Sequence, residues 1–472
     1  MALMRCLYCG LLQDEPVGVK SCIRCGGELD FEVKPPSNGR ISYIRVQMEL
    51  DQINAPAGRI VDRHLLITLG TPEQVPSREC APTQAGRKPL NFTTVLDISG
   101  SMNGAKLTQA KEAVKQALLY LHDGDTFSLV TFSDSVRCVF EPVQIDNETR
   151  KTIKNALSEI ASGGMTALCG GLELGLEKAI IFRQDTNLVL LLSDGQANVG
   201  ITDLEQIGVR AFQARQSNIV VSTLGVGSDY NEALMVEIAN RGGGRFYHIV
   251  EANQISAFVT GELGEIANLA ARETILKLSL PPSSVVMPLS SIYPAHFVDD
   301  KVVISIGDIP VDTELEIPLR LTLPAQPSGS KLSIEGEITH KSPAGNELTA
   351  HLNRVTVRFS DAASFKLRDG VVAPVVEHVL QQMKSSQVLE VSRAMAHSPA
   401  EGQQRVNSAS ESLKSYASLL GEERAEQETG ILMENFNAVL SSAASPAAAK
   451  RVVSDAYSFQ RSSKDFTKPK KK

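Results

Sequence analysis

TTVLDISGSM, residues 93–102, joins an apolar, β-branched run to a polar motif. The run has the composition of a buried β-strand, and it ends at Asp97. Asp97, Ser99 and Ser101 then form an Asp-x-Ser-x-Ser motif immediately after the strand. Because ligands of α/β proteins bind at the carboxyl ends of strands, this position predicts a functional site.

Two further oxygen-bearing side chains follow later in the chain. Thr166 lies in SGGMTAL (162–168), and Asp194 follows the strand-like run in LVLLLSDGQAN (188–198). Hydroxyl and carboxylate oxygens are hard ligands that suit Mg²⁺, Ca²⁺ or Mn²⁺. A site with only two carboxylates leaves the ion under-neutralised, so that a carboxylate from outside could complete its coordination. The motif therefore favours metal-mediated recognition of a partner over catalysis.

Residues 90–255 alternate between apolar strands and amphipathic helices. Near-continuous apolar strands separated by helices predict a doubly wound parallel sheet, covered by helices on both faces. We expect strands at 92–97, 125–132, 187–193, 219–226 and 245–250, an edge strand at 136–143, and helices at 106–121, 147–160, 170–182, 203–216 and 230–241. We expect Asp146 to be the N-cap of the helix at 147–160.

The rest of the chain predicts a multidomain protein of α/β and β classes. Residues 272–362 alternate apolar and polar positions between turn motifs, which predicts a β-sandwich. Strands within 41–70 could complete this sandwich, so that the α/β domain would be inserted into it. Residues 371–441 have helical periodicity and predict a hairpin or small bundle. We expect residues 442–472, which end in KPKKK, to be a disordered basic tail.

Four cysteines cluster near the N-terminus in two C-x2-C pairs. Each pair can direct two thiolates at one tetrahedral ion, which predicts a structural Zn²⁺ site within a ribbon of residues 1–30. With four ligands the site is closed, so the metal stabilises the fold and does not catalyse. The predicted zinc ligands are Cys6, Cys9, Cys22 and Cys25.

Composition narrows the classes of partner. The net charge of -7 gives no general reason to expect nucleic-acid binding. No apolar run reaches the length of a membrane span, and the N-terminus lacks the apolar core of a secretory signal. We therefore expect a cytoplasmic protein.

The residues Asp97-x-Ser99-x-Ser101, Thr166 and Asp194 resemble the metal ion-dependent adhesion site of von Willebrand factor type A (VWA) domains. The element order of the domain and the segments 218–235 and 238–249 are also family-like. The resemblance implies that the two serines bind Mg²⁺ directly, as does the threonine in the ligand-competent state. It implies that the two aspartates bind directly or through water, and that a partner's Asp or Glu occupies the remaining position.

We therefore expect a non-catalytic, metal-dependent protein-interaction module that serves as a scaffold or assembly factor. One alternative is a VWA subunit that works with a separate AAA+ ATPase, as in metal chelatases. A metal-dependent hydrolase is the enzymatic alternative. Against it, the sequence contains no G-x-S-x-G or H-E-x-x-H motif and no histidine beside the predicted ligands.

Overall fold

The computed structural model describes residues 2–6, 12–15, 29–31, 42–79, 89–194, 197–227, 230–249, 251, 254–290, 292–298, 301–361, 363–441 and 446–461. The chain forms two compact units, each assembled from segments that are distant in sequence. The first comprises Met1–Pro82, Leu269–Gln387 and Val406–Glu434, and the second comprises Thr83–Asn268, Val388–Arg405 and Asn435–Lys472.

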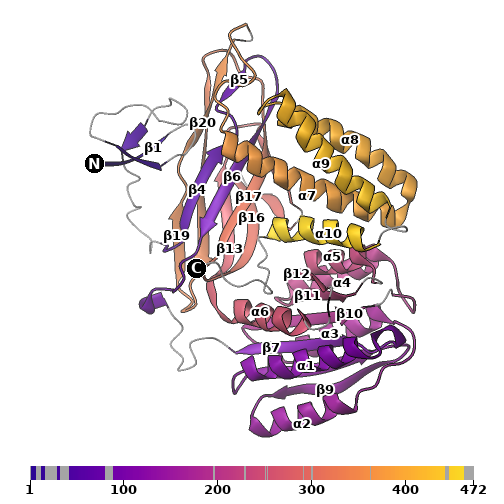
Figure 1. Ribbon diagram of the computed structural model, residues 1–472. Helices are drawn as coiled ribbons and strands as arrows, with labels where there is room; N and C mark the ends of the chain where they lie inside the picture. Colours follow the sequence, from indigo (N-terminus) through magenta and orange to yellow (C-terminus); the bar gives the residue numbers. More distant parts are fainter. Residues whose placement is uncertain are drawn as a thin grey trace. The chain divides into compact units, whose positions relative to one another are not determined.

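A six-stranded sheet organises the second unit, in the order β12-β11-β10-β7-β8-β9 (Figure 1). All neighbours are parallel except β9, which pairs antiparallel with β8 at one edge. The α/β expectation is thus confirmed, with one antiparallel strand added. The strands are β7 (Leu90–Asp97), β8 (Thr126–Phe132), β9 (Val136–Gln144), β10 (Thr186–Ser193), β11 (Val220–Val226) and β12 (Gly243–Ile249).

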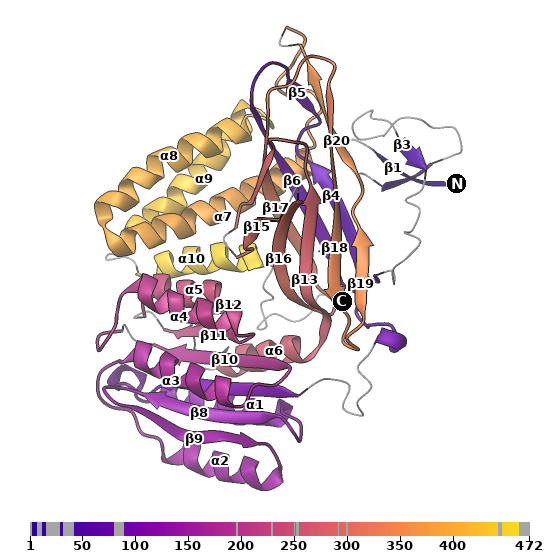
Figure 2. The same ribbon diagram turned by 180° about the vertical axis from the view of Figure 1, so that it is seen from behind.

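Helices cover both faces of this sheet because its strands are apolar on both sides. The side chains of α1, α2 and α6 share one hydrophobic cluster with alternate strand residues such as Phe92 and Leu96. The other face packs against α3, α4 and α5, and the two views in Figures 1 and 2 show α1 and α3 on opposite sides. The helices are α1 (Ala105–Tyr120), α2 (Asn147–Glu159), α3 (Leu168–Ile181), α4 (Leu204–Gln216), α5 (Glu232–Arg241) and α6 (Ile255–Ala267).

Helix α3 lies unusually close to the sheet because two glycines face it. A Cβ atom at Gly175 would lie 2.3 Å from Val95 Cγ2, and one at Gly171 would lie 2.5 Å from Phe132 Cδ1. Both distances are below van der Waals contact, so only glycine, which has no Cβ atom, fits at these two positions. The close approach fixes the start of α3, and with it the loop that carries Thr166.

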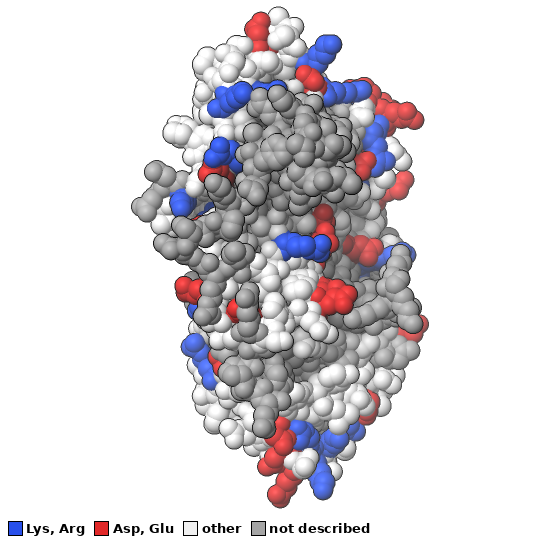
Figure 3. All heavy atoms as spheres, turned by 90° about the vertical axis from the view of Figure 1, so that its left-hand side faces the viewer, with Lys and Arg blue, Asp and Glu red and all other residues white. Residues whose placement is uncertain are grey.

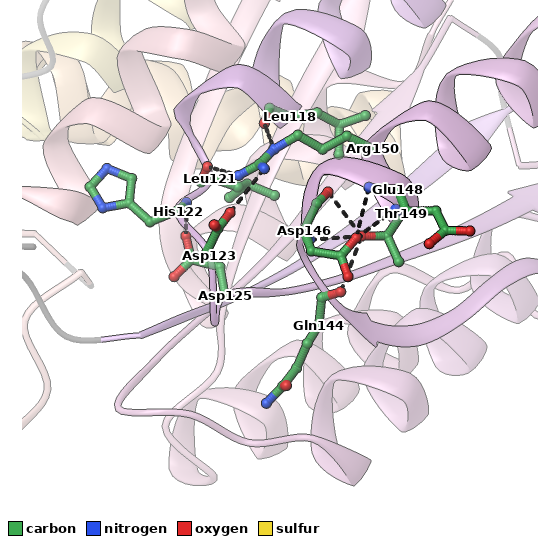
Figure 4. A network of polar contacts seen from close by, with 10 residues as sticks. All are labelled: Leu118, Leu121, His122, Asp123, Asp125, Gln144, Asp146, Glu148, Thr149 and Arg150. Carbon is green, nitrogen blue, oxygen red and sulfur yellow. Dashed lines mark hydrogen bonds and ion pairs between the residues drawn. The ribbon is translucent and has the colours of Figure 1, made fainter.

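The amino-terminal end of α2 is fixed by polar contacts (Figure 4). Asp146 caps α2 by accepting hydrogen bonds from the backbone of Glu148 and Thr149 at 2.9 and 2.8 Å, which confirms its predicted role. Arg150 donates to the Leu121 carbonyl at 2.8 Å and forms an ion pair with Asp123 at 2.9 Å. These contacts join α2 to the turn that follows α1.

A further helix, α10 (Pro446–Arg461), belongs to the same unit, where the sequence predicts a disordered tail. It packs beside β12 and α5. Tyr457 is fully buried, its ring lies edge-on to Phe246 with centroids 5.7 Å apart, and its hydroxyl donates to the Gly244 carbonyl at 3.1 Å. Helix α10 therefore covers part of the edge strand β12, which also contacts α5. Residues 442–445 and 462–472 lie outside the described part of the chain.

Two β-sheets form the core of the first unit. One contains seven strands, in the order β15-β16-β13-β18-β20-β5 with β19 on β18, and the other has the order β14-β17-β6-β4. Side chains of both sheets, such as Leu65, Leu276 and Leu319, share a single buried cluster, as in a β-sandwich. The strands are β4 (Arg45–Leu50), β5 (Asn54–Pro56), β6 (Val61–Gly70), β13 (Leu269–Ser279), β14 (Val285–Pro288), β15 (Ala295–Val298), β16 (Lys301–Pro310), β17 (Glu314–Leu323), β18 (Lys331–Lys341), β19 (Glu347–His351) and β20 (Val355–Ser360).

Strands from before and after the α/β segment pair directly in this sandwich. β6 pairs with β17 over ten residues, and β5 runs parallel to β20. Helix α6 stops at Ala267, and β13 begins at Leu269. The change from helix to strand here returns the chain to the sandwich.

Three helices follow the sandwich in sequence: α7 (Ala373–His397), α8 (Pro399–Ala417) and α9 (Glu422–Leu440). Within the first unit, Lys384 of α7 forms a buried ion pair with Glu428 of α9. Tyr416 of α8 donates to Asp51 Oδ2 at 3.0 Å, which ties this helix to the end of β4. No described helix is both long and apolar enough to cross a membrane.

The N-terminal segment contains a three-stranded sheet in the order β2-β1-β3. Its strands are β1 (Ala2–Cys6), β2 (Leu12–Glu15) and β3 (Leu29–Phe31). Cys6 ends β1, whereas Cys9, Cys22 and Cys25 lie outside the described residues. The zinc site stays a prediction.

Candidate metal and ligand-binding site

The Asp-x-Ser-x-Ser motif folds back on itself at the carboxyl end of β7. β7 ends at Asp97, and the chain then enters a short 3-10 turn, Gly100–Met102. The Ser99 backbone N–H donates to Asp97 Oδ1 at 2.8 Å, and the hydroxyls of Ser99 and Ser101 lie 3.0 Å apart. The turn therefore gathers three of the predicted ligands on one side of the strand end.

Asp194 lies beside this motif because β10 and β7 are parallel neighbours in register, with Leu192 opposite Leu96. Ser101 Oγ donates to Asp194 Oδ1 at 2.7 Å. Ser193 Oγ, one residue earlier, donates to Asp97 Oδ2 at 2.5 Å. Hydrogen bonds thus connect the two strand ends through both carboxylates.

Thr166 approaches from the loop before α3. This loop is held against the Asp97 motif by backbone hydrogen bonds from Gly163 to the Ile98 carbonyl at 2.8 Å and from Gly100 to the Gly164 carbonyl at 3.0 Å. Gly164 has φ +84°. A Cβ there would lie 2.3 Å from Asp134 Oδ1, so both the conformation and the space require glycine.

The Thr166 backbone is fixed from the other side by the loop after β10. Its N–H donates to Asn198 Oδ1 at 2.8 Å, and its carbonyl accepts from the Asn198 N–H at 3.1 Å. Three loops therefore converge at one end of the sheet, and they bring the five residues expected from the sequence to the same place.

Most of the site is removed from solvent. Asp97 and Asp194 are each 0% exposed, Ser99 2% and Thr166 3%. The pKa of Asp97 is raised above its usual value. Burial is the largest cause, and the charge of Asp194 acts in the same direction, whereas hydrogen bonds from Ser193 and Ser99 partly offset the rise. Keeping both of these buried carboxylates ionised is costly unless positive charge lies nearby, because neither is stabilised by bulk water.

Lys106 is the site residue that sequence reasoning missed. It lies in the first turn of α1, and its ammonium contacts Asp194 Oδ2. Ser193 and Asn198, which orient Asp97 and Thr166, were also not anticipated. Ser193 and Lys106 are close in sequence to predicted ligands, but only the fold shows that their side chains contact Asp97 and Asp194.

The donor set fits a hard divalent cation. It offers two carboxylates and three hydroxyls; four of these groups follow the adjacent parallel strands β7 and β10, and the Thr166 hydroxyl comes from the loop before α3. The described residues contain no group of three or more His, Cys, Asp or Glu side chains that could hold a metal ion, so an ion at this site would depend on the hydroxyls as well as on the two carboxylates. Hydroxyl and carboxylate oxygens are the types of ligand that suit Mg²⁺.

Comparison with known proteins gives the domain type. Residues 91–260 match the von Willebrand factor type A domain. Uncharacterized protein YfbK of Escherichia coli is 28% identical over 255 residues, which cover 52% of this chain and 43% of that protein. Human inter-alpha-trypsin inhibitor heavy chain H3 is also 28% identical, over 48% of this chain and 26% of its own length. The chain spans less than half of each of these two relatives.

Solved structures extend the likeness in fold beyond this segment. A von Willebrand factor type A protein from Catenulispora acidiphila has a TM-score of 0.61 at 18% identity, covering 86% of this chain and 91% of that one. The ArnB paralog VWA2 from Sulfolobus acidocaldarius has a TM-score of 0.54 at 18% identity, covering 89% and 99%. Residues 91–260 therefore form a VWA domain, and the two solved structures share the fold over most of this chain.

Proposed function

We propose that this chain is a non-catalytic protein-interaction module that binds a partner carboxylate through a divalent metal ion. VWA domains are typically interaction or adhesion modules, which supports the class of function. The observation that carries the proposal is the convergence of two buried carboxylates with a set of hydroxyls at one sheet end. The proposed ligands of Mg²⁺, Ca²⁺ or Mn²⁺ are Asp97, Ser99, Ser101, Thr166 and Asp194.

The site is buried on the protein side and open at its rim. Ser101 is exposed, and Met165, next to Thr166, is 52% exposed. An ion held by the buried oxygens could therefore be reached by a side chain from outside. When bound, the ion supplies a positive charge that a partner's Asp or Glu can coordinate.

The residues around the ligands favour binding over catalysis. Ser193, Asn198 and Lys106 contact the site, and they orient ligands or balance charge. None of these three is a general base near neutral pH in the way that histidine is. On the described part of the face in Figure 3, basic and acidic side chains are mixed, and neither sign predominates. Separately, the net charge of -7 gives no general reason to expect a nucleic-acid partner.

The finer expectations belong to the same proposal. Cys6, Cys9, Cys22 and Cys25 would bind a structural Zn²⁺, and the protein would act in the cytoplasm. A separate AAA+ ATPase stays among the candidate partners.

The test combines metal binding with partner capture. Wild-type protein, Asp97→Ala and a control, Asp123→Ala, would be titrated with Mg²⁺ and Mn²⁺ by calorimetry. Asp123 is exposed and pairs with Arg150 away from the site, so its loss removes the same charge without touching the proposed ligands. We expect binding by wild type and Asp123→Ala only.

The same three proteins would then be used to capture partners from cell lysate in Mg²⁺ or in EDTA. Partners recovered with Mg²⁺ by wild type and the control, but not by Asp97→Ala, are expected. Equal recovery by all three proteins, with or without EDTA, contradicts the mechanism.

A further inference from the structure

Lys106 occupies a position that a lysine would not normally favour. It is the second residue of α1, where the amino-terminal end of the helix dipole carries partial positive charge. A cation at this end of a helix is destabilising unless an anion offsets it. The anion here is Asp194, whose carboxylate is 0% exposed, whereas the Lys106 side chain is 27% exposed.

The local backbone holds the ammonium in place. Gly104, with φ +82°, turns the chain into α1 so that the first helical turn lies over the site. A Cβ at Gly227, directly after β11, would lie 3.3 Å from Lys106 Nζ. The lysine therefore fits between the Asp194 carboxylate and the end of β11, and a side chain at Gly227 would crowd it.

Both oxygens of Asp194 are engaged in this arrangement. Oδ1 accepts from Ser101, a proposed metal ligand, and Oδ2 contacts Lys106. With both aspartates ionised and Lys106 protonated, these three side chains have a net charge of −1. A divalent ion would bring the total to +1, which leaves an excess that one carboxylate can neutralise.

We propose that Lys106 is the internal counter-cation of this site: it balances Asp194 when no ion is bound, and it weakens ion binding by repulsion. This inference rests on the proposed function and describes how the same site is regulated. Because repulsion makes the ion alone bind weakly, an incoming carboxylate that restores neutrality strengthens ion binding. Ion and partner therefore bind cooperatively.

The test compares Lys106→Gln with Lys115→Gln. Both changes remove one positive charge from α1, but Lys115 pairs only weakly with Glu112, at 3.8 Å, on the outer part of the helix. The first measurement is thermal unfolding in EDTA. We expect Lys106→Gln to unfold at a lower temperature than Lys115→Gln, because Asp194 loses its neutralising partner. Equal unfolding temperatures overturn the role of Lys106 as a counter-cation.

The second measurement is Mn²⁺ affinity by calorimetry. We expect Lys106→Gln to bind Mn²⁺ about tenfold more tightly than wild type, because one unit of repulsive charge near the ion is removed. Unchanged or weaker binding overturns the inference, and weaker binding would show that Lys106 positions Asp194 as a ligand.

The two failures can be told apart. If neither wild type nor Lys106→Gln binds any divalent ion, the proposed function and the regulatory half of this inference fail together. The EDTA comparison needs no metal, so it still decides whether Lys106 neutralises Asp194.

Discussion

Replacing Tyr457 by alanine tests whether α10 is part of the VWA-containing unit. The tyrosine ring is 0% exposed, lies edge-on to Phe246 and donates a hydrogen bond to the Gly244 carbonyl. Truncating a buried aromatic side chain to alanine costs about 3–5 kcal/mol of unfolding free energy. Tyr457→Phe keeps the ring and removes only the hydroxyl, so it should cost about 1 kcal/mol.

The control is Asp455→Ala on the same helix. Asp455 is exposed and pairs with Arg451 at 3.8 Å, four residues earlier. Such surface pairs contribute about 0.3–0.5 kcal/mol, so this variant should unfold almost like wild type. The comparison separates loss of packing from any general effect of changing the C-terminal segment.

The assay is urea unfolding followed by far-ultraviolet circular dichroism, since the chain contains no tryptophan for fluorescence. Hydrogen exchange measured by mass spectrometry then locates the effect in a chain with two compact units. We expect peptides covering 243–249, the edge strand β12, to lose protection in Tyr457→Ala. If Tyr457→Ala and Asp455→Ala have the same unfolding midpoint and β12 stays protected, α10 does not pack where the structure places it.

Three further changes test other parts of the fold. Gly171→Ala should destabilise the α/β unit by about 1–3 kcal/mol in chemical unfolding, because the new methyl group overlaps Phe132; equal or greater stability would contradict the close approach of α3. Burial, followed by the charge of Lys450, lowers the pKa of His248, so the unfolded chain binds more protons and stability should fall as pH falls through about 6.5. His248→Gln should flatten this pH dependence of the melting temperature, and an unchanged slope would argue against it. Glu428→Gln leaves the buried Lys384 ammonium without its anion and should cost about 3–5 kcal/mol, whereas a loss below 1 kcal/mol would show that the pair is solvated.

Much of the α/β unit could be predicted from periodicity alone. Continuous apolar strands between amphipathic helices lead to a sheet covered on both faces, and the structure contains that sheet. The antiparallel pairing of β9 could not be read in the same way, since its alternating exposed and half-buried residues fit either direction. The direction of an edge strand depends on how the chain connects it to its neighbour and on which edge of the sheet is still unpaired.

The C-terminal helix shows what pattern reading can miss. The Ser, Ala and Lys content of residues 442–472 predicts a disordered tail. Yet Ala449, Val453, Ala456 and Tyr457 are buried at helical spacing along α10. That spacing was readable, but the apolar partner of the helix lies more than 200 residues away, at Gly244 and Phe246. A short amphipathic helix is stable only when such a partner covers its apolar face.

The sequence by itself determined the kind of chemistry at the candidate site. Asp97, Ser99, Ser101, Thr166 and Asp194 follow strand-like or glycine-rich segments, and parallel strands place their carboxyl ends together. The choice of hard oxygen donors is a property of residue type, so it needed no coordinates.

Only the tertiary structure decided the charge balance of that site. Lys106 and Asp194 are 88 residues apart, and nothing in the spacing of either motif pairs them. Their contact depends on where the first turn of α1 lies relative to the end of β10, which is set by side-chain packing on the sheet. Residue type fixes which ions a group of ligands can bind, whereas the distance between charges fixes how tightly it binds them, and such distances exist only in the folded chain.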